Sequence, residues 1–221
     1  MNSHNSEFLT VLFADLSGFT ALTETHGDQD ASDIAERFYA LAQESLTGDA
    51  RLVKTIGDAV MIVATDPAAA IGTALKLAAS VEAEPGFPAV RVGLHLGPCI
   101  ERRGDYFGAT VNIAARVTAF ARSGQVLCTE PAAEAIRNLN IAALQPAGAE
   151  RFKNVSQLMT LFELHDPHRP LVSGDFDPVC RMRLDLERAP ARLPYGDRVY
   201  YFCSFNCAQK FARTPEVYAL T

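Results

Sequence analysis

The sequence predicts an α+β fold, in which helices pack on one face of a ferredoxin-like sheet, followed by a small C-terminal α+β module. Strand-like and helix-like runs interleave along the first 165 residues. Two strand-like runs flank Gly57-Asp58, which is typical of a β-hairpin. A segment with Pro and Gly at 165–174 then separates a stretch too short to build a strong core by burial alone.

Apolar periodicity places the elements along the chain. The first strand is expected to end at Ser17-Gly18, and β-branched or alternating runs mark the later strands. Apolar residues at three- and four-residue spacing mark the helices. The expected strands are 8–16, 52–56, 59–64, 90–96, 125–129 and 160–164, and the expected helices are 32–46, 68–83, 111–121 and 131–137.

We expect a main domain at 1–165, a linker at 166–174 and a cysteine module at 175–221. The formal net charge is −6, and its sign changes at this boundary. Residues 1–168 hold 12 Lys/Arg and 20 Asp/Glu, whereas 169–221 hold 8 and 6. The acidic main body argues against duplex nucleic acid as a partner, but not against a nucleotide bound through metal ions.

The sequence contains no run of about 18 apolar residues, so we expect no membrane span. The first residues lack the basic start and apolar stretch of a signal peptide, so we expect a cytoplasmic, reducing location. The five cysteines are then expected as free thiols or metal ligands rather than as disulfides. Cys99 and Cys128 lie in apolar stretches and are expected in the core.

Two carboxylates are expected at neighbouring strand ends. Asp15 follows the first strand, and Asp58 lies at the tip of the hairpin. Each alone fits an ordinary turn or cap, but together they could hold divalent cations such as Mg²⁺. Lys54 is a charged residue on an otherwise apolar strand, which an edge position or a solvated face would also explain.

Asn112 and Arg116 lie one helical turn apart and so share a helix face. The helix is otherwise small and apolar. The pair could present hydrogen-bond donors to an anion, or it could be a polar stripe facing solvent.

Three blocks of the sequence resemble the motifs of class III adenylyl and guanylyl cyclases. They are Phe13–Thr20 (FADLSGFT), Lys54–Asp58 (KTIGD) and Asp105–Gly108 (DYFG), the last leading to Val111–Arg116 (VNIAAR). They occur in the family's order, and the resemblance covers about residues 7–165.

The resemblance implies a role for each matched residue. Asp15 and Asp58 correspond to the aspartates that bind two Mg²⁺ or Mn²⁺ ions. Lys54 and Asp105 correspond to the pair that reads the purine, and Lys with Asp goes with adenine. Asn112 would orient the ribose and Arg116 would stabilise the pentavalent phosphate.

One departure concerns the loop at 151–156. It resembles the family's basic loop, but Val155 stands where some members carry a further phosphate-binding lysine. Lys153 or backbone amides could bind the polyphosphate instead.

The implied reaction is attack of the ribose 3′-hydroxyl of ATP on the α-phosphate, which forms cyclic AMP and releases pyrophosphate. The family's catalytic domains pair head to tail, and the two aspartates come from one subunit and the other residues from its partner. One chain carries both halves here, so the resemblance implies a homodimer. His26 and His95 have no role in this scheme and are expected in the core or on the surface.

The C-terminal segment at about 175–220 resembles the YHS family of small cysteine modules. Cys203 and Cys207 are four residues apart, and Cys180 could supply a third thiolate for zinc or copper(I). No histidine follows His168, so Asp177, water or an open position would have to complete a tetrahedral site. The alternative is three buried cysteines that bind nothing.

Three functions remain open at this point. The first is an active adenylyl cyclase that the C-terminal module could regulate. The second is a non-catalytic nucleotide-binding or interaction protein that keeps the fold, against which the intact set of six residues argues. The third makes metal sensing or handling the primary task.

Overall fold

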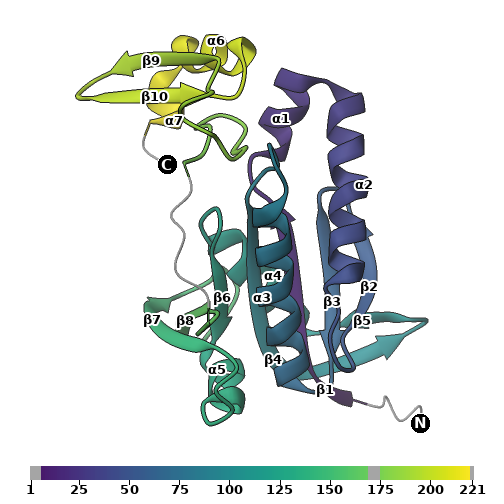
Figure 1. The fold of residues 1–221 in the computed structure, drawn as a ribbon. Helices are drawn as coiled ribbons and strands as arrows, with labels where there is room; N and C mark the ends of the chain where they lie inside the picture. The colour runs from purple at the N-terminus through teal and green to yellow at the C-terminus, as the bar shows by residue number, and fades with distance from the viewer. Residues whose placement is uncertain (1–5, 169–174, 220–221) are drawn as a thin grey trace.

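The structure is a computed structural model that describes residues 6–168 and 175–219. The predicted linker 166–174 therefore lies mostly outside the described residues. Within them, one eight-stranded sheet has the order β2-β3-β1-β4-β6-β8-β7, with β5 paired to β4 (Figure 1). Its strands are β1 (Ser6–Leu16), β2 (Arg51–Ile56), β3 (Ala59–Ala64), β4 (Val90–Arg102), β5 (Asp105–Phe107), β6 (Val126–Thr129), β7 (Ala143–Glu150) and β8 (Met159–His165).

The main domain combines helices with a largely antiparallel sheet, which confirms the predicted α+β class. The β2–β3 hairpin is present as predicted, and Gly57 takes the left-handed conformation in its turn (φ 59°). Among the strand pairs of this sheet, β4 and β6 run parallel and the others antiparallel. The helices are α1 (Phe19–His26), α2 (Asp28–Glu44), α3 (Pro67–Ala83), α4 (Ala109–Phe120) and α5 (Glu130–Ile136).

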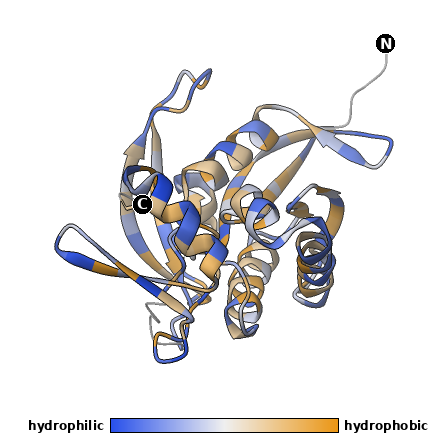
Figure 2. Ribbon diagram, turned by 90° about the horizontal axis from the view of Figure 1, so that it is seen from above, coloured by the Kyte–Doolittle hydropathy of each residue, from blue (hydrophilic) through white to orange (hydrophobic). Residues whose placement is uncertain are grey.

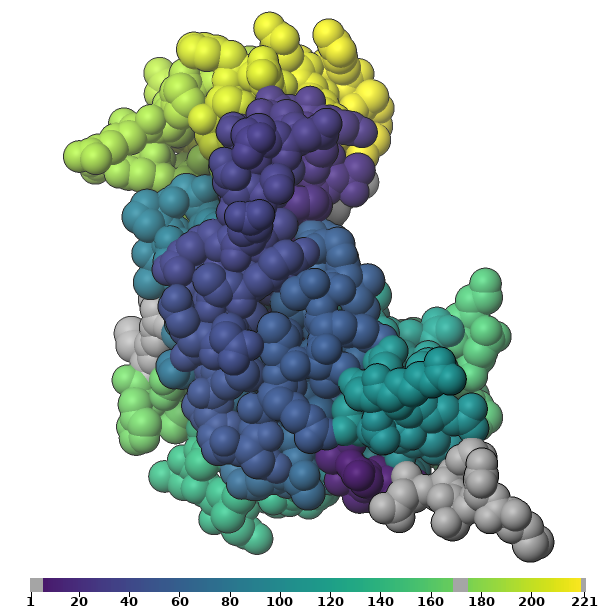
Figure 3. Space-filling view, turned by 90° about the vertical axis from the view of Figure 1, so that its right-hand side faces the viewer, coloured from purple at the N-terminus to yellow at the C-terminus, as the bar shows by residue number. Residues whose placement is uncertain are grey.

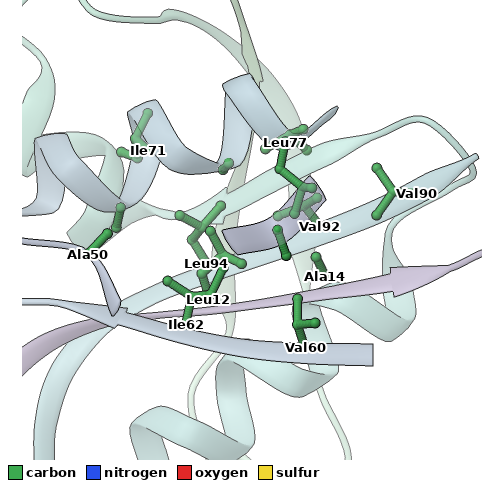
Figure 4. Packing of buried hydrophobic residues seen from close by; sticks show 14 of the residues in the cluster. Leu12, Ala14, Ala50, Val60, Ile62, Ile71, Leu77, Val90, Val92 and Leu94 are labelled. Atoms are coloured by element: carbon green, nitrogen blue, oxygen red, sulfur yellow. The ribbon is translucent and has the colours of Figure 1, made fainter. Parts of the chain in front are cut away.

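Helices cover both faces of the sheet, which corrects the expectation of one covered face. Leu12 and Ala14 of β1 point to the α2–α3–α5 side, where the main core lies (Figure 4). The alternate residues Val11 and Phe13 lie in a second cluster with Ala114 of α4. Successive side chains of a strand point to opposite faces, so a strand that is apolar throughout requires cover on both sides.

Cys99 and Cys128 are buried, as expected, and His95, expected in the core or on the surface, is buried as well. Nδ1 of His95 lies 2.7 Å from Oγ1 of Thr129, and burial lowers the His95 pKa to about 4. Burial also raises the pKa of the Cys128 thiol to about 12. These groups are therefore uncharged at neutral pH and serve packing.

The C-terminal module contains β9 (Ala191–Tyr195), β10 (Arg198–Phe202), α6 (Phe205–Arg213) and α7 (Pro215–Tyr218). It sits over the α1 end of the main domain in both Figure 1 and Figure 3. Leu22 of α1 and Ala31 of α2 share a buried cluster with module residues that include Val179, Phe202 and Phe211. The module thus extends its small core with residues of the main domain.

The module also adds backbone contacts to the segment before β4. Arg181 O accepts from Ala89 N at 3.1 Å, and Arg183 N donates to Phe87 O at 3.1 Å. The Arg183 guanidinium pairs with Glu82 at 3.1 Å. The interface therefore combines an apolar cluster with backbone hydrogen bonds and an ion pair, which fix how the module aligns with the main domain.

Hydrophilic residues gather at the tips of the projecting hairpins (Figure 2). Across 6–168 and 175–219, no helix combines the length and the apolar character that crossing a membrane would need.

Candidate functional site

Asp15 and Asp58 lie together at the same end of the sheet, Asp15 near the end of β1 and Asp58 in the turn that leads into the neighbouring strand β3. Asp15 pairs in register with Ala59, and Leu16 N donates to Asp58 O at 3.2 Å. Burial, and then the charge of the neighbouring Asp15, raise the pKa of the Asp58 carboxyl. A divalent cation bound between these two half-buried carboxylates would offset both the burial and the repulsion that raise the Asp58 pKa.

Arg91 is a member of this site that the sequence reasoning missed. It stands opposite Asp15 in the β1–β4 ladder, and its Nε donates to Asp15 Oδ2 at 2.6 Å. The Asp15 side chain is only 17% exposed. Arg91 thus supplies positive charge to the same carboxylate that the resemblance assigns to metal.

Lys54 and Asp105 come together although they lie on different strands. Lys54 Nζ lies 2.7 Å from Oδ1 and 2.6 Å from Oδ2 of Asp105. Both side chains remain about one third exposed. The structure therefore brings the two predicted purine-reading residues into one charged pair that is open to a ligand.

The strand register places Lys54 and Asp15 on the same face of the sheet. Lys54 pairs with Met61, which lies in the same cluster as Phe13, and Asp15 follows Phe13 by two positions. Side chains two apart on a strand share a face. This is also the face that α4 covers.

Asn112 and Arg116 both lie on α4, as predicted, with Asn112 exposed and Arg116 half-buried. The helix is anchored by Val117 and by Thr118, whose Oγ1 donates to Phe13 O at 3.2 Å. Within the described residues of the same chain, neither the Asn112 nor the Arg116 side chain has a hydrogen-bond or ion-pair partner. Their donors are available to a ligand.

Lys153 is exposed in the turn between β7 and β8, next to Asn154 with φ 64°. Arg151 braces this turn by donating to Ser156 O at 2.9 Å, and buried Phe152 anchors it. In the part of the chain that the structure describes, no hydrogen bond or ion pair ties Lys153 to the other predicted site residues.

A second group of chemistry-bearing residues lies between the module and α1. Cys180, Cys203 and Cys207 come together as predicted, but the fourth member is His26, which the sequence reasoning left without a role. Their ligand atoms all lie within 4.8 Å of one another. His26 Nε2 is 3.4 Å from Cys203 Sγ and 3.8 Å from Cys207 Sγ.

Asp177 supports this cluster from behind. It is fully buried, and its carboxylate accepts from the backbone N–H groups of Val179, Cys180 and Cys203 at 2.8, 3.2 and 2.8 Å. Its oxygens therefore shape the two cysteine loops. The expectation that Asp177 could supply the missing fourth ligand gives way to His26, which points its ring nitrogen at the sulfurs.

The pKa values of the three thiols are shifted in different directions. Hydrogen bonds from Cys180 and Cys203 lower the pKa of Cys207, and hydrogen bonding to Cys203 raises that of Cys180. Cys207 lies in the first turn of α6, where the helix dipole also favours a thiolate.

Comparisons with known proteins agree with the two-part architecture. Residues 1–162 match the family described as the adenylate and guanylate cyclase catalytic domain, and residues 176–221 match the YHS domain. The pH-sensitive adenylate cyclase of Mycobacterium tuberculosis is 43% identical over 128 residues, which is 58% of this chain and 32% of that protein. A copper-transporting P-type ATPase of Rhizobium leguminosarum is 39% identical over 54 residues, 24% of this chain and 6% of that protein.

A solved adenylate cyclase of Trypanosoma brucei, in its monomeric state, has a similar fold. The TM-score is 0.66 at 25% identity, over 77% of this chain and 95% of that one. The chain spans only about a third of the length of the curated adenylate cyclases it matches.

Proposed function

The chain belongs to the family of class III adenylate and guanylate cyclase catalytic domains, and on that basis we propose that it converts ATP to 3′,5′-cyclic AMP and pyrophosphate. The observation that carries the proposal is the Lys54–Asp105 pair. Adenine offers an acceptor at N1 and a donor at N6, and the pair offers a donor and an acceptor in return. Guanine presents the opposite pattern on that edge and would meet like groups.

Asp15 and Asp58 would hold two divalent cations, Mg²⁺ or Mn²⁺. Bound ions would lower the pKa of the ribose 3′-hydroxyl and stabilise the negative charge on the leaving pyrophosphate. The chain's own contribution is the paired carboxylates at a strand edge, one of which is disfavoured as a free anion by burial and by its neighbour. Arg91 donates to Asp15 Oδ2 and so holds this carboxylate in place beside Asp58.

Asn112 and Arg116 would act on the reacting end of the substrate. Asn112 would orient the ribose so that its 3′-hydroxyl faces the α-phosphate. Arg116 would donate to the phosphate oxygens as the pentavalent transition state gathers negative charge. Lys153, in the exposed β7–β8 turn, would bind the polyphosphate.

We propose that the site is assembled by two copies of the chain. Within residues 6–168 and 175–219, the Asn112 and Arg116 side chains have no hydrogen-bond or ion-pair partner in their own chain. This supports the proposal, because a second copy would bring them a metal-bound substrate. Ile56 and Phe107, two positions beyond Lys54 and Asp105, are about half exposed at 49% and 50%. Exposed apolar side chains beside a charged pair suit the centre of a homodimer interface.

The experiment is an assay of the pure full chain with ATP and with GTP, in Mg²⁺ or Mn²⁺. Formation of cyclic AMP, a preference for ATP and its loss in Asp15→Ala would support the proposal. Turnover that survives Asp15→Ala would contradict the assigned site. Nucleotide binding without turnover in wild type would favour the alternative, a non-catalytic nucleotide-binding or metal-sensing protein that retains the fold.

A further inference from the structure

We propose that His26, Cys180, Cys203 and Cys207 bind one Zn²⁺ ion, and that this ion fastens the C-terminal module to helix α1 of the main domain. The inference concerns metal binding alone, so it does not depend on the proposed cyclase activity. The cysteine module at 175–221 contains no histidine, so the fourth ligand, His26, comes from the main domain.

The distances fit a tetrahedral site. Zn–S bonds of about 2.3 Å and Zn–N bonds of about 2.0–2.1 Å imply edges of roughly 3.8 Å between sulfurs and roughly 3.6 Å between sulfur and nitrogen. The observed edges are 3.3 Å for Cys180–Cys203 and 3.7 Å for Cys203–Cys207. The edges from His26 Nε2 to Cys203 and Cys207 are 3.4 and 3.8 Å. The other two of the six edges, from Cys180 to Cys207 and to His26, are within 4.8 Å.

The surroundings hold the ligands in place before a metal arrives. Asp177 fixes the loops of Cys180 and Cys203 through backbone N–H groups. Ser204 caps α6 by accepting from Cys207 N at 3.1 Å. Asn206 Nδ2 donates to Thr25 O at 3.0 Å, which joins α6 to the end of α1 beside His26. A site whose ligands are fixed in this way loses little entropy on binding.

The charges also fit a dication. Three thiolates and a neutral imidazole around Zn²⁺ leave one net negative charge, and the thiol protons that binding displaces pass to solvent. The N-terminus of α6 lies at Cys207, and Arg181 follows Cys180, so positive charge is available to offset that residual charge.

Zn²⁺ is favoured over Cu⁺ by the number and kind of ligands. Closed Cys₃His tetrahedra are a standard structural zinc arrangement. Copper(I) is also selected by soft thiolates, and three sulfurs alone would suffice for it. A requirement for His26 therefore distinguishes the two ions.

The site would tie together two parts of the chain that otherwise meet through packing and a few polar contacts. His26 is the last residue of α1, and Cys180, Cys203 and Cys207 belong to the module. α1 begins three residues after Leu16, directly beyond Asp15 and the Ser17-Gly18 turn. A bound ion would therefore restrain the segment that carries a candidate catalytic carboxylate.

The test uses the metal-free full chain under a phosphine reductant. Co²⁺ is titrated first, because its d–d and thiolate charge-transfer bands report tetrahedral geometry and sulfur ligation, and Zn²⁺ is then used to displace it. We expect one ion per chain and a tetrahedral spectrum. His26→Ala should weaken Zn²⁺ binding by more than the roughly 10–100-fold that loss of a residue supporting a ligand costs. His168→Ala, an exposed histidine away from the cluster, is the matched control.

His26→Cys guards against a folding artefact, because a Cys₄ set should restore tight binding with a stronger charge-transfer band. Hydrogen exchange of α1 should slow on Zn²⁺ addition in wild type and not in Cys203→Ser. The proposal is overturned if wild type binds no stoichiometric Zn²⁺. It is equally overturned if His26→Ala binds Zn²⁺ like wild type, or if only Cu⁺ binds tightly and without regard to His26.

Discussion

Nε2 of His26 lies 3.4 Å from the sulfur of Cys203, although 177 positions separate the two residues in the chain. This contact closes the interface between the module and α1. On the same side of the molecule, Gly18 lies against Cys180 and Arg181. The turn after Asp15 and the metal-ligand loop of the module are thus packed directly on each other.

Gly18→Ala should destabilise the packing of the module against this turn. A Cβ at Gly18 would lie 2.9 Å from Arg181 Cγ and 3.0 Å from the Cys180 carbonyl group. Overpacking of this kind costs about 1–3 kcal/mol, beyond the roughly 1–2 kcal/mol of a left-handed alanine. Gly196→Ala is the matched control, because Gly196 has a similar positive φ and nothing within 4 Å of its Cβ. Urea unfolding should rank Gly18→Ala below Gly196→Ala, and equal losses would contradict the close contact.

Lys54→Ala and Asp105→Ala should each lower kcat/KM for ATP. Each removes a hydrogen bond to a charged group, worth about 1.5–3 kcal/mol, or roughly 10–150-fold. Because the two side chains contact each other at 2.6–2.7 Å, the double variant should lose less than the product of the single losses. Steady-state kinetics on the three variants test this, and strict additivity would mean that the two residues act separately.

Arg116→Ala should reduce turnover far more than substrate binding. The expected loss in kcat is about 10²–10³-fold with a small change in KM, because the charge it stabilises develops only in the transition state. Arg188→Ala, whose side chain is 87% exposed on the module, provides the control and should retain wild-type kinetics. A rise in KM with unchanged kcat would instead make Arg116 a ground-state binding residue.

Asp58→Asn should stabilise the metal-free protein while it abolishes turnover. Burial and Asp15 raise the folded-state pKa of Asp58 above its usual value of about 3.9, so its ionised form opposes folding. The wild type therefore loses stability relative to Asp58→Asn as the pH rises from about 4 through the raised pKa.

Asp58→Asn should therefore have a higher Tm than the wild type at neutral pH, and the difference should shrink toward pH 4. Thermal unfolding in chelator, between pH 4 and 8, measures it. Mg²⁺ or Mn²⁺ should then raise the Tm of the wild type more than that of Asp58→Asn. A variant that is less stable than wild type at neutral pH would contradict the electrostatic account of this pair.

Local patterns were sufficient to predict most of the sheet, and contacts between distant segments were not. The β2–β3 hairpin follows from Gly57-Asp58, and α4 from apolar spacing that the structure confirms. β7 was missed because Pro146 and Gly148 interrupt it, with a bulge between them, as an edge strand tolerates. β5 was missed because its three residues are too few to show a period.

The candidate site residues also fall into those found in local motifs and those that depend on contacts between distant segments. Asp15, Lys54, Asp58, Asp105, Asn112 and Arg116 sit in short motifs and could be predicted by position. Arg91 could not, because its contact with Asp15 depends on the β1–β4 register. His26 could not, because only the docking of the module on α1 brings it to the cysteines.

Mixing two inactive variants tests most directly whether two copies of the chain share one catalytic site. Asp58→Ala lacks a residue of one half-site, and Arg116→Ala lacks a residue of the other. In an equimolar mixture, half of the dimers carry both variants, and each of these has one intact site of two, so about a quarter of wild-type cyclic AMP formation should return. A mixture as inactive as either variant alone, with subunit exchange demonstrated, would contradict the shared site.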